Sequence, residues 1–226
     1  MIKLAIFDLD GTLVNSLADL ADAVNQGLRQ LGHPTHPTEA FRYFVGNGVP
    51  KLCERALPAD CKGEQEQLRT LFAAYYQAHC MEKTRPYPEM RETLDALRQS
   101  GLQLAVASNK DHDFTSEIVS HFFGDKLFAC VSGRKPGCAG KPDPAILQVC
   151  MDVCGCTPAE TVMIGDSNVD MLTAQNASMR AIGCLWGFRT AEELQSGGAA
   201  CLAESPAGLP DCIARLDAAA SEVNQA

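Results

Sequence analysis

LAIFDLDGT, residues 4–12, is a short apolar run that ends in two carboxylates two positions apart, Asp8 and Asp10, followed by Gly11 and Thr12. Two like charges at the end of a buried strand are unfavourable, because their repulsion and their desolvation both cost free energy. The pattern is explained if a cation neutralises the pair or if one carboxylate reacts with a bound group. The alternative is a polar turn, for which Asp-Gly is a common dipeptide.

Short apolar runs recur along the chain, and helical patterns separate most of them. The runs that we expect to form strands are residues 4–7, 102–107, 128–131, 161–164 and 180–184. Between them, apolar residues recur near the helical period over residues 111–122, 144–153 and 169–177. Strands buried on both faces that alternate with helices predict an α/β fold, a Rossmann-like parallel sheet with right-handed crossovers. Ligands bind beyond the carboxyl ends of such strands, where Asp8 and Asp10 lie.

Residues 15–85 break this alternation, with helical patterns and no convincing strand. One apolar stripe runs from Leu17 to Leu31 and another from Leu68 to Tyr76. We therefore predict an inserted all-helical cap domain, residues 15–85, and an α/β core domain formed by residues 1–14 and 86–226. Pro86 and Pro88 stiffen the return to the core. After residue 192 the pattern indicates only a last short strand and an amphipathic helix near Ile213 and Leu216.

The composition excludes several classes of function. The 226 residues are 46% hydrophobic and 21% charged, as in an ordinary soluble globular protein. The net charge of -9 argues against a nucleic-acid partner or an anionic membrane surface, since both need a basic protein surface. No apolar stretch approaches membrane-spanning length, and the first residues show no signal peptide, so we expect a cytoplasmic protein. The oligomeric state, monomer or homodimer, stays open.

Eleven cysteines are many for this length, and an odd number cannot pair completely. Without a secretory signal we expect reduced thiols. Cys150, Cys154 and Cys156 form the tightest group, and the first two share a helix face, so a metal or redox role is conceivable. No C-x-x-C pair occurs, and cysteine in such helices is usually a small buried hydrophobe, which is the interpretation we favour.

Two further motifs supply groups that suit a phosphate. Ser108-Asn109-Lys110 follows a strand and precedes a helix, where a hydroxyl and backbone N–H groups can bind phosphate oxygens. A helix cap is the alternative for Ser108.

Lys141, in the stretch GKPDP, stands just before a helix that Pro144 can open. It precedes proline and lacks the upstream glycine, so this is no nucleotide-binding P-loop. A solvated surface charge is its alternative, and Lys135 competes for the same role.

A second buried strand also ends in acid. Residues 161–164 are followed by Asp166, and Asp170 comes four residues later at the start of a helix. Asp170 and Ser167 could simply favour and cap the helix N-terminus. All these features are explained together by one site that collects a nucleophilic carboxylate, acids for a cation, a hydroxyl and a lysine.

The order of these motifs resembles the haloacid dehalogenase superfamily, and more narrowly its phosphoglycolate phosphatase-like branch, in which a helical cap lies between the first and second motifs. The motifs are Asp-Leu-Asp-Gly-Thr, the serine after the second strand, Gly-Lys-Pro-Asp-Pro and Gly-Asp-Ser-x-x-Asp. The resemblance covers nearly the whole chain. It implies a Mg²⁺-dependent phosphatase that acts on a small phosphorylated metabolite through an aspartyl-phosphate, with 2-phosphoglycolate favoured.

The resemblance also implies roles for individual residues. Asp8 is the expected nucleophile, and its carboxylate, the Asp10 carbonyl and Asp166 are the expected Mg²⁺ ligands. The phosphoryl group is expected to meet four residues: Thr12, Ser108, Asn109 and Lys141.

The Asp10 side chain is expected to act as acid and base, a role that favours phosphoester hydrolysis over dehalogenation. Thr12 is expected to hold Asp10 in place, and Asp170 to orient a water molecule or Lys141.

Within the predicted cap, residues 44–48 are the segment most similar to this branch. The expected substrate loop comprises Arg42, Gly46, Asn47 and Gly48. Arg42, Lys51 and Arg55 could meet a substrate carboxylate, although solvated helix charges are the alternative. A lid of this kind closes to exclude water. Two departures from the branch stand outside the catalytic set: Ser178, where glycine is common, and the basic loop 133–137.

Several rival functions stay open at this point. The nearest is a phosphatase acting on pyrophosphate, a sugar phosphate or a nucleotide, and a sugar phosphomutase shares the catalytic set. A non-catalytic phosphate-binding module is a different class, but it has no use for a paired nucleophile and acid. A thiol-redox role is the remaining alternative.

Overall fold

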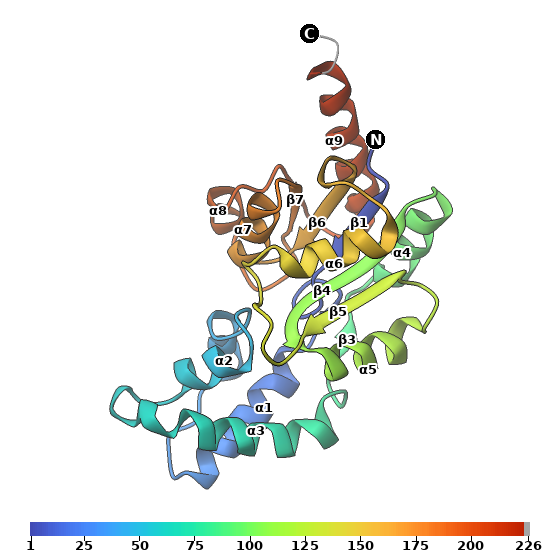
Figure 1. Ribbon diagram of the computed structural model, residues 1–226. Helices are drawn as coiled ribbons and strands as arrows, with labels where there is room; N and C mark the ends of the chain where they lie inside the picture. The colour runs from blue at the N-terminus through green and yellow to red at the C-terminus, as the bar shows by residue number, and fades with distance from the viewer. Residues whose placement is uncertain (224–226) are drawn as a thin grey trace.

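A computed structural model describes residues 1–223, and its centre is a six-stranded parallel sheet (Figure 1). The strand order is β5-β4-β1-β6-β7-β8. The strands are β1 (Leu4–Phe7), β4 (Gln103–Asp111), β5 (Cys130–Arg134), β6 (Thr161–Gly165), β7 (Arg180–Cys184) and β8 (Cys201–Ala203). All neighbouring pairs are parallel, which confirms the predicted Rossmann-like α/β fold.

Helices cover both faces of this sheet, and alternate side chains of β1 pack against the helices on opposite faces. Ala5 and Phe7 pack with α4 (Met90–Gln99), α5 (His112–Phe123) and α9 (Leu209–Val223). Leu4 and Ile6 point to the other face, against α6 (Ala145–Cys154), α7 (Asn168–Asn176) and α8 (Ala191–Ser196). Two covered faces explain why β1 is an uninterrupted apolar run. Burying one such side chain stabilises the fold by roughly 1.5–3 kcal/mol.

The segment predicted as a cap consists of helices grouped below the sheet in Figure 1. They are α1 (Leu17–Gln30), α2 (Val49–Ala56) and α3 (Gln65–His79), with short 3₁₀ helices at Thr38–Tyr43 and Ala59–Glu64. The predicted stripes of α1 and α3 face one another, and Leu20, Leu28, Leu68 and Phe72 lie in an apolar cluster of their own. Two more 3₁₀ helices, Pro158–Glu160 and Pro206–Gly208, belong to the sheet region.

The links into and out of this helical segment form a feature that the sequence did not indicate. β2 (Val14–Asn15) and β3 (Arg85–Pro86) pair antiparallel, with Val14 opposite Pro86. The expectation of no strand here is wrong, because two residues are too few for an alternating pattern and proline argues against a strand. The domain boundaries at residues 15 and 85 stay a prediction, and this ribbon lies at both of them.

Other elements differ from expectation mainly at their ends. β4 continues through Ser108, Asn109 and Lys110 to Asp111, with a register irregularity after Ala107, whereas the predicted strand ended there. β5 begins at Cys130, two residues later than predicted. β8 and α9 confirm the short strand and the helix near Ile213.

All eleven cysteines are free thiols, and Cys150 is buried in the core. No helix within residues 1–223 is long and apolar enough to cross a bilayer.

Candidate active site

Three acids meet at the carboxyl ends of β1 and β6. Phe7 pairs in register with Ile164, so Asp8 and Asp166 leave neighbouring strands near the same point. Asp170 comes from the first turn of α7. One carboxylate oxygen from each acid lies within 4.8 Å of the others, and all three residues are buried. The topology therefore joins acids that are far apart in the sequence.

The turn that follows β1, residues 9–14, fixes the side chain of Asp166. Gly11 has a φ of 88°, and a Cβ at this position would lie 2.3 Å from Asp166 Oδ2, so only glycine fits. The Thr12 hydroxyl donates to Asp166 Oδ1 at 3.3 Å, and the Phe188 N–H donates to Oδ2 at 2.8 Å. The expectation that Thr12 holds Asp10 is wrong. The N–H groups of Leu13 and Val14 both donate to the Leu9 carbonyl, and this tight turn carries Thr12 toward Asp166.

Lys141 is the lysine that reaches the acids. Its Nζ lies 2.9 Å from Asp8 Oδ1 and 2.6 Å from Asp170 Oδ1, and its side chain is only 1% exposed. Burial opposes the charged form, but Asp170 and Asp8 outweigh it and raise the pKa of Lys141. Lys135, the competing candidate, is exposed in the loop after β5.

Asp170 has contacts that suit both the helix cap and the orientation of Lys141. It pairs with Lys141, and its Oδ2 accepts from the Ser167 hydroxyl at 2.7 Å and from the Ser167 N–H at 3.1 Å. This reciprocal capping begins α7 and points the remaining oxygen of Asp170 at Lys141.

The carboxylates of this site outnumber the ammonium groups that neutralise them. Burial raises the pKa of Asp8 to about 7, although Lys141 opposes this shift. Burial, with Asp170 and Asp8 nearby, raises the pKa of Asp166 to about 8. With Asp10 and Lys110 included, four carboxylates face two ammonium groups, so full ionisation leaves two negative charges. Oxygen ligands and this charge fit a hard divalent cation such as Mg²⁺.

Asp10 is held by two residues that the sequence did not single out. The Ser16 hydroxyl donates to Asp10 Oδ1 at 2.5 Å, and Lys110 Nζ lies 3.2 Å from each carboxylate oxygen. Burial opposes the charged form of Lys110, but Asp10 and Tyr76 raise its pKa. A signal existed: residues two apart on a strand point to the same side, so Lys110 shares the side of Ser108.

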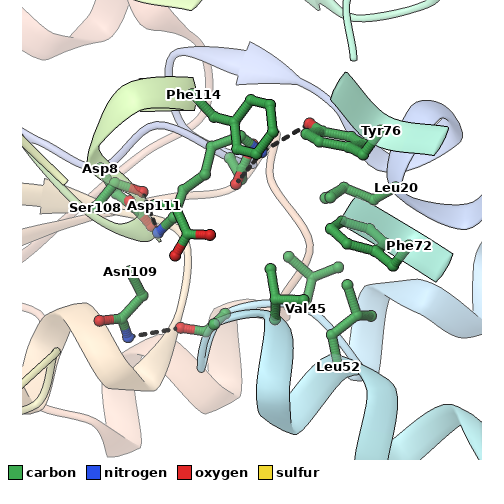
Figure 2. Close-up of a pocket in the computed structure, with 15 residues that line it drawn as sticks. Asp8, Leu20, Val45, Leu52, Phe72, Tyr76, Ser108, Asn109, Asp111 and Phe114 are labelled. Atoms are coloured by element: carbon green, nitrogen blue, oxygen red, sulfur yellow. Dashed lines mark hydrogen bonds and ion pairs between the residues drawn. The ribbon is translucent and has the colours of Figure 1, made fainter. Parts of the chain in front are cut away.

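Ser108 and Asn109 lie beside the acids, at the irregular end of β4, and both are buried. Asn109 Nδ2 donates to the carbonyls of Lys141 and Gly46, each at 3.0 Å. The bond to Gly46 ties the sheet to the loop before α2 (Figure 2). Asn109 Oδ1 is buried and has no partner within residues 1–223. The phosphate-binding roles of Ser108 and Asn109 stay a prediction.

A cavity lies between these polar groups and the helical segment. Its empty space is about 510 Å³, part of it open to solvent. In Figure 2, Asp8 and Ser108 lie on one side and Leu20, Val45 and Phe72 on the other.

Of the expected substrate loop, Gly46 and Gly48 line the cavity. Arg42 instead donates to the Gly187 carbonyl at 3.1 Å, and Asn47 accepts from Arg55 at 2.7 Å.

The cations proposed for a substrate carboxylate have other partners. Lys51 pairs with Glu54 at 2.7 Å, and Arg55 donates to the carbonyls of Tyr43 and Phe44. Among the residues that line the cavity, Lys110 carries the one ammonium or guanidinium group.

The parallel sheet and its buried carboxylate–lysine cluster define an enzyme of the α/β class, whose three clustered acids could hold a cation. The chain belongs to the haloacid dehalogenase-like hydrolase family, whose model matches residues 5–184. It is an enzyme of the phosphatase class.

Curated relatives and solved structures agree with this family. A phosphoglycolate phosphatase of Psychrobacter arcticus is 37% identical over 85% of the chain and 87% of its own length. One from Pseudomonas putida is 34% identical over 95% and 78%. A crystal structure described as that of a phosphoglycolate phosphatase from Lactobacillus delbrueckii subsp. bulgaricus is 32% identical to this chain in sequence. The two structures superpose with a TM-score of 0.88 over 93% of this chain and 98% of that one.

Proposed function

We propose that this enzyme is a Mg²⁺-dependent phosphatase that hydrolyses a small phosphorylated metabolite through an aspartyl-phosphate, and that 2-phosphoglycolate is the favoured substrate. The observation that carries the proposal is the buried cluster in which Asp8 lies 2.9 Å from Lys141 and beside Asp166 and Asp170. The relatives named phosphoglycolate phosphatase support the choice of substrate.

Asp8 is the proposed nucleophile. Its carboxylate forms a bond to phosphorus while the bond from phosphorus to the leaving oxygen breaks. A phosphate dianion can approach a carboxylate only where positive charge offsets their repulsion, and Lys141 supplies such a charge at this position. Ser108 and the Asn109 N–H are proposed to bind the phosphoryl oxygens.

Mg²⁺ is proposed to bind the carboxylates of Asp8 and Asp166 and the backbone carbonyl of Asp10, with Asp170 close by. The two excess negative charges of the cluster and its oxygen ligands fit this ion. When bound, Mg²⁺ supplies positive charge to the carboxylates and to the phosphoryl group.

Asp10 is proposed to move protons. It gives a proton to the leaving oxygen as the phosphoenzyme forms, and it then takes one from the water that attacks phosphorus. The second step releases phosphate and restores Asp8. The contacts of Ser16 and Lys110 with Asp10 suit this role, because they fix the orientation of its carboxyl group at the cavity that Asp8 also lines.

The wall of the cavity is mainly apolar, with Asp8, Asp10 and Asp111 as its acids and Lys110, which is paired with Asp10, as its cation. A small leaving group suits such a wall better than a nucleotide or pyrophosphate, and the names of the relatives support 2-phosphoglycolate among small substrates. The alternatives are a phosphatase for another small substrate and a sugar phosphomutase, which returns the phosphoryl group to an intermediate. We also propose a cytoplasmic location, which suits eleven free thiols.

A panel of phosphorylated metabolites, each assayed for phosphate release with Mg²⁺ and with EDTA, tests the proposal. We expect release from 2-phosphoglycolate with Mg²⁺ and none with EDTA. Asp8→Asn should abolish turnover and leave the fold intact, whereas Asp113→Asn, an exposed acid on α5, should leave turnover unchanged. Full activity of Asp8→Asn, or no release from any member of the panel, would contradict the proposal. Product analysis with a sugar 1-phosphate separates hydrolysis from the mutase reaction.

A further inference from the structure

Lys110 joins the proposed acid/base residue, Asp10, to the helical segment. Its Nζ lies 3.2 Å from both carboxylate oxygens of Asp10 and 2.8 Å from the hydroxyl of Tyr76 (Figure 2). Asp10 follows β1, Lys110 lies in β4, and Tyr76 lies in α3. A single ammonium group therefore connects the sheet and the predicted cap at the reacting centre.

Tyr76 is held tightly in this position. It is 1% exposed, its ring stacks on Phe72 with centroids 5.0 Å apart, and Phe114 packs edge-on against it at 5.2 Å. Lys110 Nζ also lies 4.7 Å from the centre of the Tyr76 ring, a cation–π contact. Phe114 belongs to α5, so Tyr76 contacts the sheet domain through both its ring and its hydroxyl.

The other side of Asp10 is also attached to the helical segment. Ser16, whose hydroxyl donates to Asp10 Oδ1 at 2.5 Å, lies between β2 and α1. The carboxyl of Asp10 is thus held between a residue at the base of α1 and a lysine that rests on α3. A shift of these helices relative to the sheet would alter both contacts.

We propose that Lys110 and Tyr76 are positioning residues that orient the Asp10 carboxyl toward the leaving oxygen when α3 is seated over the sheet. The contacts of Ser16, Lys110 and Tyr76 hold the carboxyl group in one orientation, and proton transfer to the leaving oxygen depends on that orientation. The inference rests on the proposed phosphatase function and adds two residues to it.

This role has a chemical signature. An alkoxide is a poor leaving group and needs a proton from Asp10, whereas p-nitrophenolate leaves without one. A variant that misplaces Asp10 should therefore lose activity on alkyl phosphates much more than on aryl phosphates. A merely structural defect lowers both activities together.

Tyr76→Phe is the central test, because it removes the hydroxyl and keeps the ring packing. With Mg²⁺ present, we expect its kcat on 2-phosphoglycolate, or on the best alkyl phosphate of the panel, to fall about tenfold. Its KM should change less than kcat, and its kcat on p-nitrophenyl phosphate should stay within about twofold. Tyr75→Phe is the matched control. Tyr75 directly precedes Tyr76 on α3 and does not line the cavity, so loss of its hydroxyl should change neither activity.

Lys110→Met should show the same selectivity with a larger loss, about a hundredfold on the alkyl phosphate, and Lys110→Arg should recover part of it. Thermal unfolding of each variant identifies loss of fold, and Tyr76→Phe decides the matter if Lys110→Met does not fold. Equal losses on alkyl and aryl phosphates, or no loss in Tyr76→Phe, overturn the inference while leaving the phosphatase intact. If the wild-type enzyme releases phosphate from no member of the panel, that result overturns the proposed function instead.

Discussion

Lys141 and Asp170 form an ion pair of 2.6 Å in which the two side chains are 1% and 0% exposed. Desolvation of both charges is costly, and the pair persists because Asp8 also contacts Lys141 and Ser167 donates twice to Asp170. Residues from the GKPDP stretch and from α7 are thereby fixed against the end of β1. The pair connects the stability of the protein to the position of Asp8, the proposed nucleophile.

Removal of Asp170 should therefore destabilise the protein and impair catalysis together. Asp170→Ala leaves Lys141 with one carboxylate partner and removes the α7 cap, so we expect the free energy of unfolding to fall by about 3–5 kcal/mol. Urea unfolding without Mg²⁺ measures this change. Glu117→Ala, an exposed acid on α5, should stay within about 0.5 kcal/mol of wild type. Two variants of equal stability would contradict the role given to this pair.

Gly187 should prove essential for metal binding although it offers no ligand. A Cβ there would lie 2.2 Å from Asp166 Cβ and 2.6 Å from the Gly11 carbonyl oxygen, so Gly187→Ala must displace Asp166. We expect the Kd for Mg²⁺, measured by calorimetric titration, to rise about 10- to 100-fold. Gly63→Ala serves as the control, because a Cβ there meets nothing within 4 Å. Unchanged Mg²⁺ affinity in Gly187→Ala would remove Asp166 from the metal site.

The stability of the Mg²⁺-free protein should fall as the pH rises. The pKa values of Asp8 and Asp166, about 7 and about 8, lie above those of unfolded carboxyl groups, so the folded protein favours their protonated forms. Their contribution to stability is fully present below about pH 4 and is lost as the pH rises through 7 and 8. In EDTA we expect the contribution of this site to the Tm to decline between about pH 4 and pH 8 and to level off above pH 8.

Mg²⁺ should reverse this trend, because the ion binds the carboxylate forms. The rise in Tm on adding Mg²⁺ is therefore expected to grow from pH 6 to pH 9, as measured by differential scanning fluorimetry. Asp166→Asn should flatten the dependence, since it removes one of the two titrating groups. A Mg²⁺ effect of the same size at every pH would show that these carboxyl groups are ionised throughout.

Ser178 should be a position where glycine stabilises the protein. Its φ is 57°, a left-handed conformation that costs a residue with a Cβ about 1 kcal/mol. Ser178→Gly should raise the free energy of unfolding by roughly 0.5–1 kcal/mol in urea. Ser178→Ala keeps the Cβ and should give no gain. Equal gains in both variants would point to the serine side chain rather than the backbone.

Much of the candidate site follows from the sequence, because β4, β1 and β6 are neighbours in one parallel sheet. Asp8 and Asp166 follow two of these strands and Ser108 lies at the end of the third, so a motif at each strand end is enough to predict that they meet. The sheet itself was predictable because each strand and each helix carries its own apolar pattern within a short stretch of sequence.

The remaining contacts depend on geometry that no local pattern encodes. The turn after Leu9 decides that Thr12 meets Asp166 rather than Asp10. The continuation of β4 decides that Lys110 points inward. Partners inside the helical segment and in the loop after β7 decide that Arg42 and Arg55 have other contacts than the cavity. Such pairings emerge only once distant segments are packed.

The β2–β3 ribbon brings the entry and the exit of the helical segment to adjacent strands. Paired strands lie about 4.8 Å apart, so the sheet domain presents two closely spaced attachment points for whatever lies between them. An insertion with neighbouring ends can be exchanged without disturbing the host, since nothing in the sheet has to move to accommodate it. Evolution can thus replace the helical segment, and with it the wall of the cavity, while Asp8, Lys141 and Asp166 stay where the sheet places them.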